Sequence, residues 1–346
     1  MTAATKSASG SAQAAILERK ERSPLGDAVR QLLQNKLAVG SGAFILFLIF
    51  LSVFADFFNA YALQGYQDAL GPNQPPYAKQ VLQDNNARPG TASQNPSLDG
   101  FVYWFGADNL GRDVWTRTLY GTRVSLAVAA VAGAVSLTIG VTYGLISGYV
   151  GGRVDDLMMR IVDFLYGLPL LIVVILAQVY FKSLDRHSAE SGLASFLIDL
   201  DQSLGGMFFI FVVLGALSWL SMARIARGQT LSIKEKEFVE AARSLGATSP
   251  RIIFKGILPN IIGPCLVQET LQIPGYILTE AFLSFIGLGV NAPTPSWGIM
   301  INEAFQGLRS NPHALVPPAV ALTLTVLAFN FLGDGLRDAF DPRLRE

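Results

Sequence analysis

The sequence predicts an all-α integral membrane protein with six transmembrane helices. Of its 346 residues, 51% are hydrophobic and only 15% are charged, whereas an ordinary soluble domain is about 25% charged. Six apolar stretches, five of them free of charged residues, have the length that crosses the hydrocarbon core of a bilayer. Lys and Arg gather in alternate connections between these stretches, as is typical of multi-pass membrane proteins.

Each predicted span lies between charged residues, because a charge at the bilayer centre costs about 3 kcal/mol or more. The fifth span contains Glu269 and Glu280 and is predicted to be one helix kinked at Pro274–Gly275, since proline lacks a backbone donor. The six stretches are residues 37–55, a span within 124–152, 164–181, 202–223, a span near 257–286, and 310–333.

The distribution of basic residues predicts the orientation. With the N-terminus inside, 18 of the 26 Lys and Arg lie in inner segments and 8 in outer ones, so both termini are expected to be cytoplasmic. The predicted organisation is a cytoplasmic N-terminal tail (1–36), a first transmembrane helix (37–56), an outer segment (57–122), a core of five further transmembrane helices (123–333) and a cytoplasmic C-terminal tail (334–346).

Composition excludes several functions. The 26 basic and 26 acidic residues cancel, so no overall field attracts nucleic acid, and we expect no nucleic-acid partner. The single cysteine, Cys265, excludes an intrachain disulfide, and with two histidines it cannot form a Cys/His metal site. The sequence also lacks a G-x-x-x-x-G-K-[ST] loop, so this chain is not expected to hold ATP phosphates by itself.

The outer segment is expected to end in an amphipathic helix. Between residues 109 and 123, apolar side chains fall along one helical side, and Asp113 and Arg117 have the i,i+4 spacing of an ion pair. An interfacial helix and an outward extension of the second span are both compatible with this pattern.

The most informative connection lies between the fourth and fifth spans. Phe238, Ala241, Ala242 and Leu245 have the spacing of one apolar helical stripe. Gly246 then provides a left-handed C-cap, and Ser249–Pro250 provides the N-cap and first-turn proline of the next helix. A short amphipathic helix, a sharp turn and a second helix are therefore expected at the inner surface, although a solvated surface helix would show the same pattern.

This connection resembles the EAA loop of ABC importer permeases. The run EAARSLGATSPRIIFKGILPN (Glu240–Asn260) follows their pattern, with Gly256 in place of the usual isoleucine. Three further segments are similar to C-type permeases of the dipeptide/oligopeptide (peptide/nickel) family, and the likeness covers most of residues 25–346. They are FGADNLGRDVWTRTLYGTRVSL (Phe105–Leu126), TEAFLSFIGLG with TPSWG (Thr279–Gly298), and GDGLRDAFDPRLR (Gly333–Arg345).

The resemblance implies a type I ABC importer permease fold and a peptide importer in the plasma (inner) membrane of a prokaryote. The implied partners are a second permease subunit, two ATP-binding cassette subunits that bind ATP and Mg, an extracytoplasmic solute-binding protein and membrane lipid. The loop 235–260 becomes the expected ATPase-coupling site, and this chain is not itself expected to be an enzyme. The expected coupling residues are Phe238, Glu240, Ala241, Ala242, Leu245 and Gly246.

Three alternatives stay open at this point. Glu269 and Glu280 are costly inside a membrane and are candidate translocation-path residues, although a structural hydrogen bond explains Glu280 equally well. The first alternative is an ion-coupled secondary carrier that uses the two carboxylates as proton sites. A membrane scaffold without transport activity is the second alternative, and nickel or another small solute in place of peptide is the third.

Overall fold

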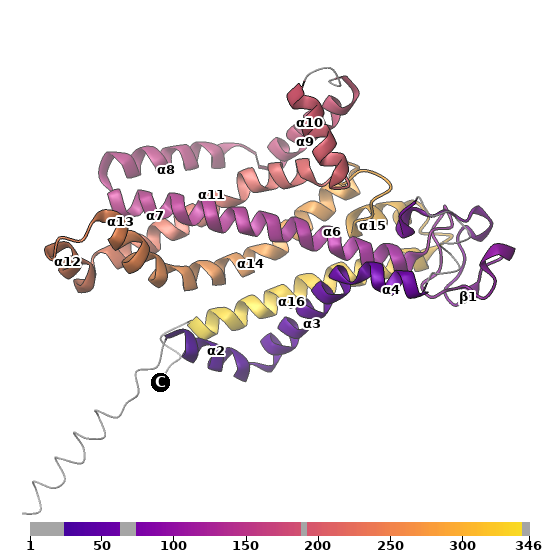
Figure 1. The fold of residues 1–346 in the computed structure, drawn as a ribbon, viewed down its shortest axis with the longest axis horizontal. Helices are drawn as coiled ribbons and strands as arrows, with labels where there is room; N and C mark the ends of the chain where they lie inside the picture. Colours follow the sequence, from indigo (N-terminus) through magenta and orange to yellow (C-terminus); the bar gives the residue numbers. More distant parts are fainter. Residues whose placement is uncertain (1–23, 63–73, 188–191, 341–346) are drawn as a thin grey trace, which may run out of the picture.

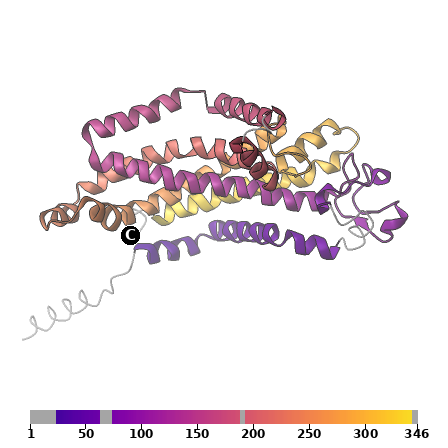
Figure 2. The same cartoon turned by 45° about the horizontal axis from the view of Figure 1, so that its top comes forward.

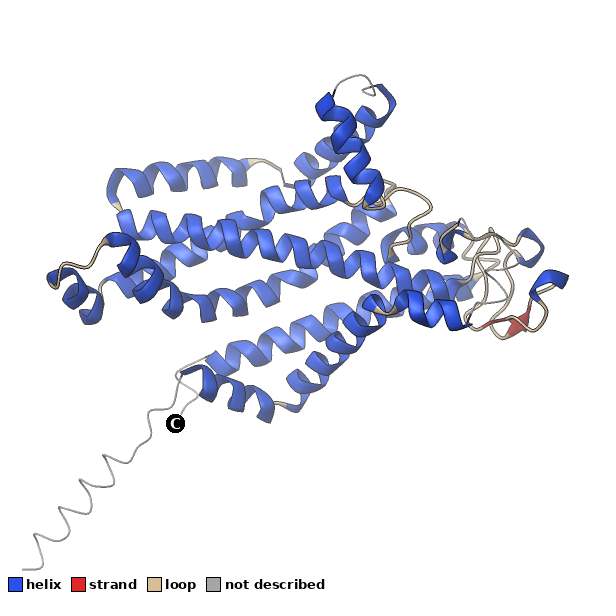
Figure 3. Cartoon of the chain, in the orientation of Figure 1, coloured by secondary structure: helices blue, strands red, loops and turns tan. Residues whose placement is uncertain are grey.

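The computed structural model describes residues 24–62, 74–187 and 192–340, and most of them are helical (Figure 3). The longer elements are α2 (Pro24–Gln34), α3 (Lys36–Val53), α4 (Ala55–Ala62), β1 (Thr91–Ala92), β2 (Val102–Tyr103), α6 (Val114–Val135), α7 (Val141–Val150), α8 (Gly152–Gly167), α9 (Leu170–His187), α10 (Gly192–Ser203), α11 (Phe208–Lys234), α12 (Glu237–Ser244), α14 (Leu258–Phe285), α15 (Trp297–Gln306) and α16 (Val316–Phe340). Short helical turns complete the set: η1 (Pro76–Ala78), η2 (Leu82–Asp84), η3 (Pro96–Leu98), η4 (Ser136–Gly140), α13 (Ser249–Arg251), η5 (Ile252–Ile257) and η6 (Pro312–Ala314).

Among the described residues, five helical stretches are long and apolar enough to cross a membrane. They match the first, second, fourth, fifth and sixth predicted spans, so the all-helical membrane fold is confirmed. Helix α14 is continuous with Pro274 inside it, so the fifth span is one helix, as predicted. The five stretches are Lys36–Val53, Val114–Val150, Phe208–Lys234, Ser249–Phe285 and Pro312–Phe340.

The third predicted span, residues 164–181, is not one straight helix. It is divided between α8 and α9, which are bent by 78° relative to each other. Leu168, between the two helices, has an extended backbone with ψ of 125°. A residue that precedes proline disfavours the helical conformation, and Pro169 follows directly. The count of uncharged residues did not take this proline into account.

The helices form an elongated bundle whose two ends differ (Figure 1). Helix α12 and the start of α2 lie at one end, and the outer segment with β1 lies at the other. Helices α2, α3 and α4 follow one another along one side of the bundle (Figure 2). The loop 235–260, predicted to be cytoplasmic, and the outer segment are thus separated along the long axis.

Three of the buried apolar clusters in the described residues join the long helices. One joins α6, α9, α11 and α14 around Val128 and Ile210. The second, around Met222 and Ile257, joins α7, α11, α12 and α14 near the α12 end. The third joins α3, α6, α14 and α16 around Trp297, which is fully buried. Since each cluster draws on helices distant in sequence, burial of these side chains fixes the arrangement of the spans.

The end of the outer segment differs from the expected interfacial helix. Helix α6 begins at Val114 and continues through η4 and α7 to Val150, so the second span extends outward. Asp113 is its N-cap and accepts a hydrogen bond from the Thr116 backbone N–H at 2.9 Å. Strands β1 and β2 pair antiparallel, with Thr91 opposite Tyr103, in the same outer region.

Candidate functional site

Helix α12 is anchored to the bundle by one buried side chain. Val239 is only 1% exposed and packs in the core cluster with Ile252 and Ile257. Ala242 is half-buried against the same cluster. The predicted apolar stripe did not include Val239, which lies about 100° round the helix from Phe238.

Most of the predicted stripe is exposed on α12. Phe238 is 45% exposed and Leu245 is 88% exposed, and Ala241 and Glu240 are exposed as well. A helix that leaves large apolar side chains in contact with solvent offers a surface that another protein can cover. Phe238 still touches the bundle, because its ring lies 3.8 Å from the position of a Cβ built on Gly256. Leu245 is almost wholly exposed and therefore does not serve to pack α12 on the bundle.

The turn after α12 has the predicted C-cap. Gly246 has a φ of 76°, which a residue without Cβ adopts at no steric cost. Its N–H bonds Arg243 O, and the N–H of Ala247 bonds Ala242 O, both at 3.0 Å, as in a Schellman motif. The following helix begins at Ser249 with Thr248 as the N-cap and no side-chain cap bond, so the predicted capping role of Ser249 is wrong.

Helix α11, which leads into α12, packs closely on α7. Gly140, Gly144 and Gly148 recur every four residues along η4 and α7 and face α11. A Cβ on Gly144 would collide with the backbone oxygen of Ala223. Small residues at this spacing let two membrane helices approach closely, and van der Waals contact then holds them together.

Polar contacts fix the same pair of helices at their α12 end. Arg227 of α11 makes two hydrogen bonds of 2.6 Å to the carboxylate of Asp155 on α8. Ser147 of α7 donates to the same carboxylate, and Lys234 donates to Gly148 O at 2.9 Å. Helices α7, α8 and α11 are thus joined beside α12, so a force on α12 acts on a braced support.

The structure places both intramembrane glutamates inside the bundle. Glu280 is fully buried and accepts hydrogen bonds from Ser125 at 2.9 Å and from Ser284 at 2.7 Å. Glu269 is 3% exposed and accepts one from Ser136 at 2.7 Å. The two bonds to Glu280 agree with the structural hydrogen bond expected as its alternative role. Neither carboxylate lies on the surface of the chain.

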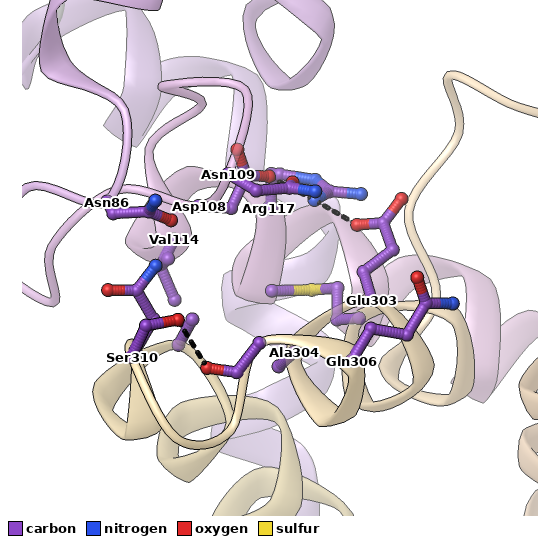
Figure 4. Close-up of a pocket in the computed structure, with 13 residues that line it drawn as sticks. Asn86, Asp108, Asn109, Val114, Arg117, Glu303, Ala304, Gln306 and Ser310 are labelled. Atoms are coloured by element: carbon purple, nitrogen blue, oxygen red, sulfur yellow. Dashed lines mark hydrogen bonds and ion pairs between the residues drawn. The ribbon is translucent and has the colours of Figure 1, made fainter.

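The sequence did not predict a buried ion-pair cluster near the N-terminal end of α6 (Figure 4). Arg117 of α6 bonds Asp108 at 2.5 Å and Glu303 of α15 at 2.6 Å. Arg112 bonds the same two carboxylates at 2.7 and 2.9 Å. The predicted Asp113–Arg117 pair is wrong, because Arg117 turns toward Glu303. The cluster borders a cavity of about 170 Å³ and connects the outer segment, α6 and α15.

The titration of Asp113 is shifted by its surroundings. Burial raises the pKa of Asp113 to about 6, although hydrogen bonds from Thr116 oppose the shift. The carboxyl lies just before the second span, at the N-cap of α6. The fold therefore holds the protonated form of Asp113 at a pH where the unfolded chain is ionised.

These features define a multi-pass helical membrane component with a braced, partly apolar helix exposed at one end and no nucleotide loop in its sequence. Comparison with known protein families agrees with this class of protein. Residues 140–346 match the model of the "binding-protein-dependent transport system inner membrane component", and residues 23–76 match that of the "N-terminal TM domain of oligopeptide transport permease C". The chain belongs to this family of ABC transporter permeases.

Relatives cover nearly the whole chain. It is 41% identical over 334 residues to a dipeptide transport system permease of Bacillus subtilis, a match that covers 96% of this chain and 90% of the relative. It is 37% identical over 329 residues to an oligopeptide transport system permease of Escherichia coli, covering 95% and 94%. Among solved structures, a chain of the methionine ABC transporter MetNI aligns with a TM-score of 0.47 and 18% identity, covering 64% of this chain and 96% of that one.

Family membership confirms the resemblance found in the sequence. The protein is a multi-pass inner-membrane permease, and it is not the ATPase of its system. As a component of a binding-protein-dependent ABC system, it acts with ATPase subunits and a binding protein. The roles of the individual loop residues and of Glu269 and Glu280 stay predictions.

Proposed function

We propose that this chain is a permease subunit of an ATP-driven importer of peptides. It pairs with a second permease to form the translocation path, and two ATPase subunits bind ATP and Mg. Relatives named for dipeptide, oligopeptide and glutathione transport support peptide over nickel as cargo. Both termini and α12 face the cytoplasm in this proposal, in agreement with the distribution of Lys and Arg.

The exposed face of α12 carries the proposal. Phe238, Glu240, Ala241, Ala242, Leu245 and Gly246 form the helix and cap that dock on an ATPase subunit. Because α12 continues from a braced α11, closure of the ATPases on ATP would move the permease helices together. Such a motion needs the ATPases to bind one permease conformation more tightly than the other.

Reconstitution tests this function against the ion-coupled alternative. Proteoliposomes that contain both permeases and both ATPases, supplied with binding protein, should take up labelled dialanine or trialanine only with ATP and Mg. This chain alone should take up neither, because its sequence holds no nucleotide loop. Uptake by the isolated chain under a proton gradient would contradict the proposal.

Purification of the binding protein of this system identifies the cargo. Mass spectrometry of its bound ligand is expected to find short peptides. Nickel or a non-peptide solute as the bound ligand would contradict peptide import while leaving the ATP-driven mechanism intact.

A further inference from the structure

Helix α14 carries a polar stripe on a side that the bundle leaves uncovered. Gln268, Gln272, Gly275 and Thr279 are separated by four, three and four residues, so they lie on one face of the helix. The three side chains are partly exposed, and Gly275 is exposed. A Cβ added at Gly275 would meet nothing within 4 Å.

Neighbouring helices border this stripe without covering it. Gln272 donates to Ser221 of α11 at 3.3 Å, which places α11 along one side. Leu271 lies against Gly333 of α16 on the other side. Thr279 turns its hydroxyl back to Gly275 O at 2.7 Å.

Lipid is an unsuitable neighbour for the stripe. An amide moved from water into hydrocarbon without hydrogen bonds loses several kcal/mol, and here two glutamines share one face of a membrane span. The side chains must therefore meet water, a polar ligand or a polar protein surface. The two carboxylates of the same helix, Glu269 and Glu280, are turned away and buried, so the stripe presents only neutral donors and acceptors.

We propose that the α14 stripe, Gln268, Gln272, Gly275 and Thr279 with Ser221 of α11, lines the water-filled path and binds the backbone amides of peptides. This inference rests on the proposed function. Dipeptides, oligopeptides and glutathione share amide groups and differ in side chains, so neutral amide partners suit them all. Bare Gly275 leaves room for the peptide between the two glutamines and Thr279.

The single cysteine permits a direct accessibility test. Cys265 is fully buried and would be replaced by Ala. Gln268→Cys or Gln272→Cys is then introduced into the complete importer in membrane vesicles. Leu266→Cys is the matched control, because Leu266 is 45% exposed but precedes Gln268 by two residues, which places it on nearly the opposite side of α14.

A membrane-impermeant charged thiol reagent is applied to the vesicles. The fraction of this chain that is labelled is measured relative to the labelling of the same chain after denaturation. The Gln268→Cys and Gln272→Cys variants should react at least tenfold faster than the Leu266→Cys control, because the thiolate forms only in water. Excess dialanine or trialanine should slow labelling of the Gln268→Cys variant at least threefold. Rates equal to that of the control would overturn the water-filled path, and labelling unaffected by both peptides would overturn the peptide contact.

Adding Gln272→Met to the Gln268→Cys chain tests the amide contact itself. Protection of the introduced thiol by peptide should weaken about threefold to tenfold, the effect of one neutral hydrogen bond. Unchanged protection would overturn the role of Gln272. ATP-driven uptake by the wild-type importer is measured first, and then by the Cys265→Ala importer. Failure of the wild type contradicts the proposed function, while the contrast between the Gln268→Cys and Leu266→Cys variants still reports whether the stripe meets water.

Discussion

Individual charged residues have roles that their spacing in sequence did not reveal. Arg117 pairs with Asp108 and Glu303 rather than with Asp113. Glu303 lies 186 positions from Arg117 in the sequence. Asp155 pairs with Arg227 across 72 positions. A buried ion pair adds little net stability compared with apolar packing, but removal of one partner leaves an uncompensated charge. These pairs therefore favour one mutual arrangement of helices over its alternatives.

Asp113 makes protein stability depend on pH. The raised pKa of about 6, against an ordinary 3.8, means that the native state holds a proton that the unfolded state lacks between these values. Stability contributed by Asp113 therefore increases as the pH falls from about 7 to 5, by about 1 kcal/mol.

Asp113→Asn keeps the N-cap and removes the titration. Thermal unfolding in detergent at several pH values should show that the stability difference between wild type and this variant shifts in favour of wild type as the pH falls. A difference that is constant with pH would show that Asp113 has an ordinary pKa.

At the scale of elements, local sequence determines where helices begin and end, and close packing determines how they pair. Gly246 predicted the end of α12 correctly because positive φ is a local requirement. The break between α8 and α9 was also readable, since Pro169 marks it. Neither Val239 as the anchor of α12 nor the contact of Gly144 with α11 could be predicted, because both depend on which helices become neighbours.

Two single variants, Gly144→Ala and Gly228→Ala, test the packing of α7 on α11. Gly144→Ala should destabilise the protein by about 1–3 kcal/mol, because the new methyl collides with backbone. Gly228→Ala in α11 should stabilise it by about 0.5–1 kcal/mol, since its Cβ meets nothing within 4 Å. Thermal unfolding of the purified protein in detergent gives both values. Equal effects of the two substitutions would contradict the close approach.

At the scale of the whole molecule, composition and charge patterning were enough to predict a multi-pass helical membrane protein, and the motifs were enough to predict its family. The distribution of uncharged stretches located five of six spans correctly. The stripe on α14 was not predicted. The sequence indicated Glu269 and Glu280 as the functional candidates on that helix, because a charged side chain is costly to insert into a membrane. Only the three-dimensional arrangement shows that Glu269 and Glu280 are turned inward and the neutral glutamines outward.

The central claim is that α12 transmits the action of separate ATPase subunits. Leu245→Glu places a charge on its exposed apolar face, and Ser244→Glu places the same charge on an exposed neighbour outside that stripe. The measurement is retention of the ATPases when the permease is purified from membranes. The account predicts at least a tenfold loss with Leu245→Glu and normal retention with Ser244→Glu, and equal retention by both variants would contradict it.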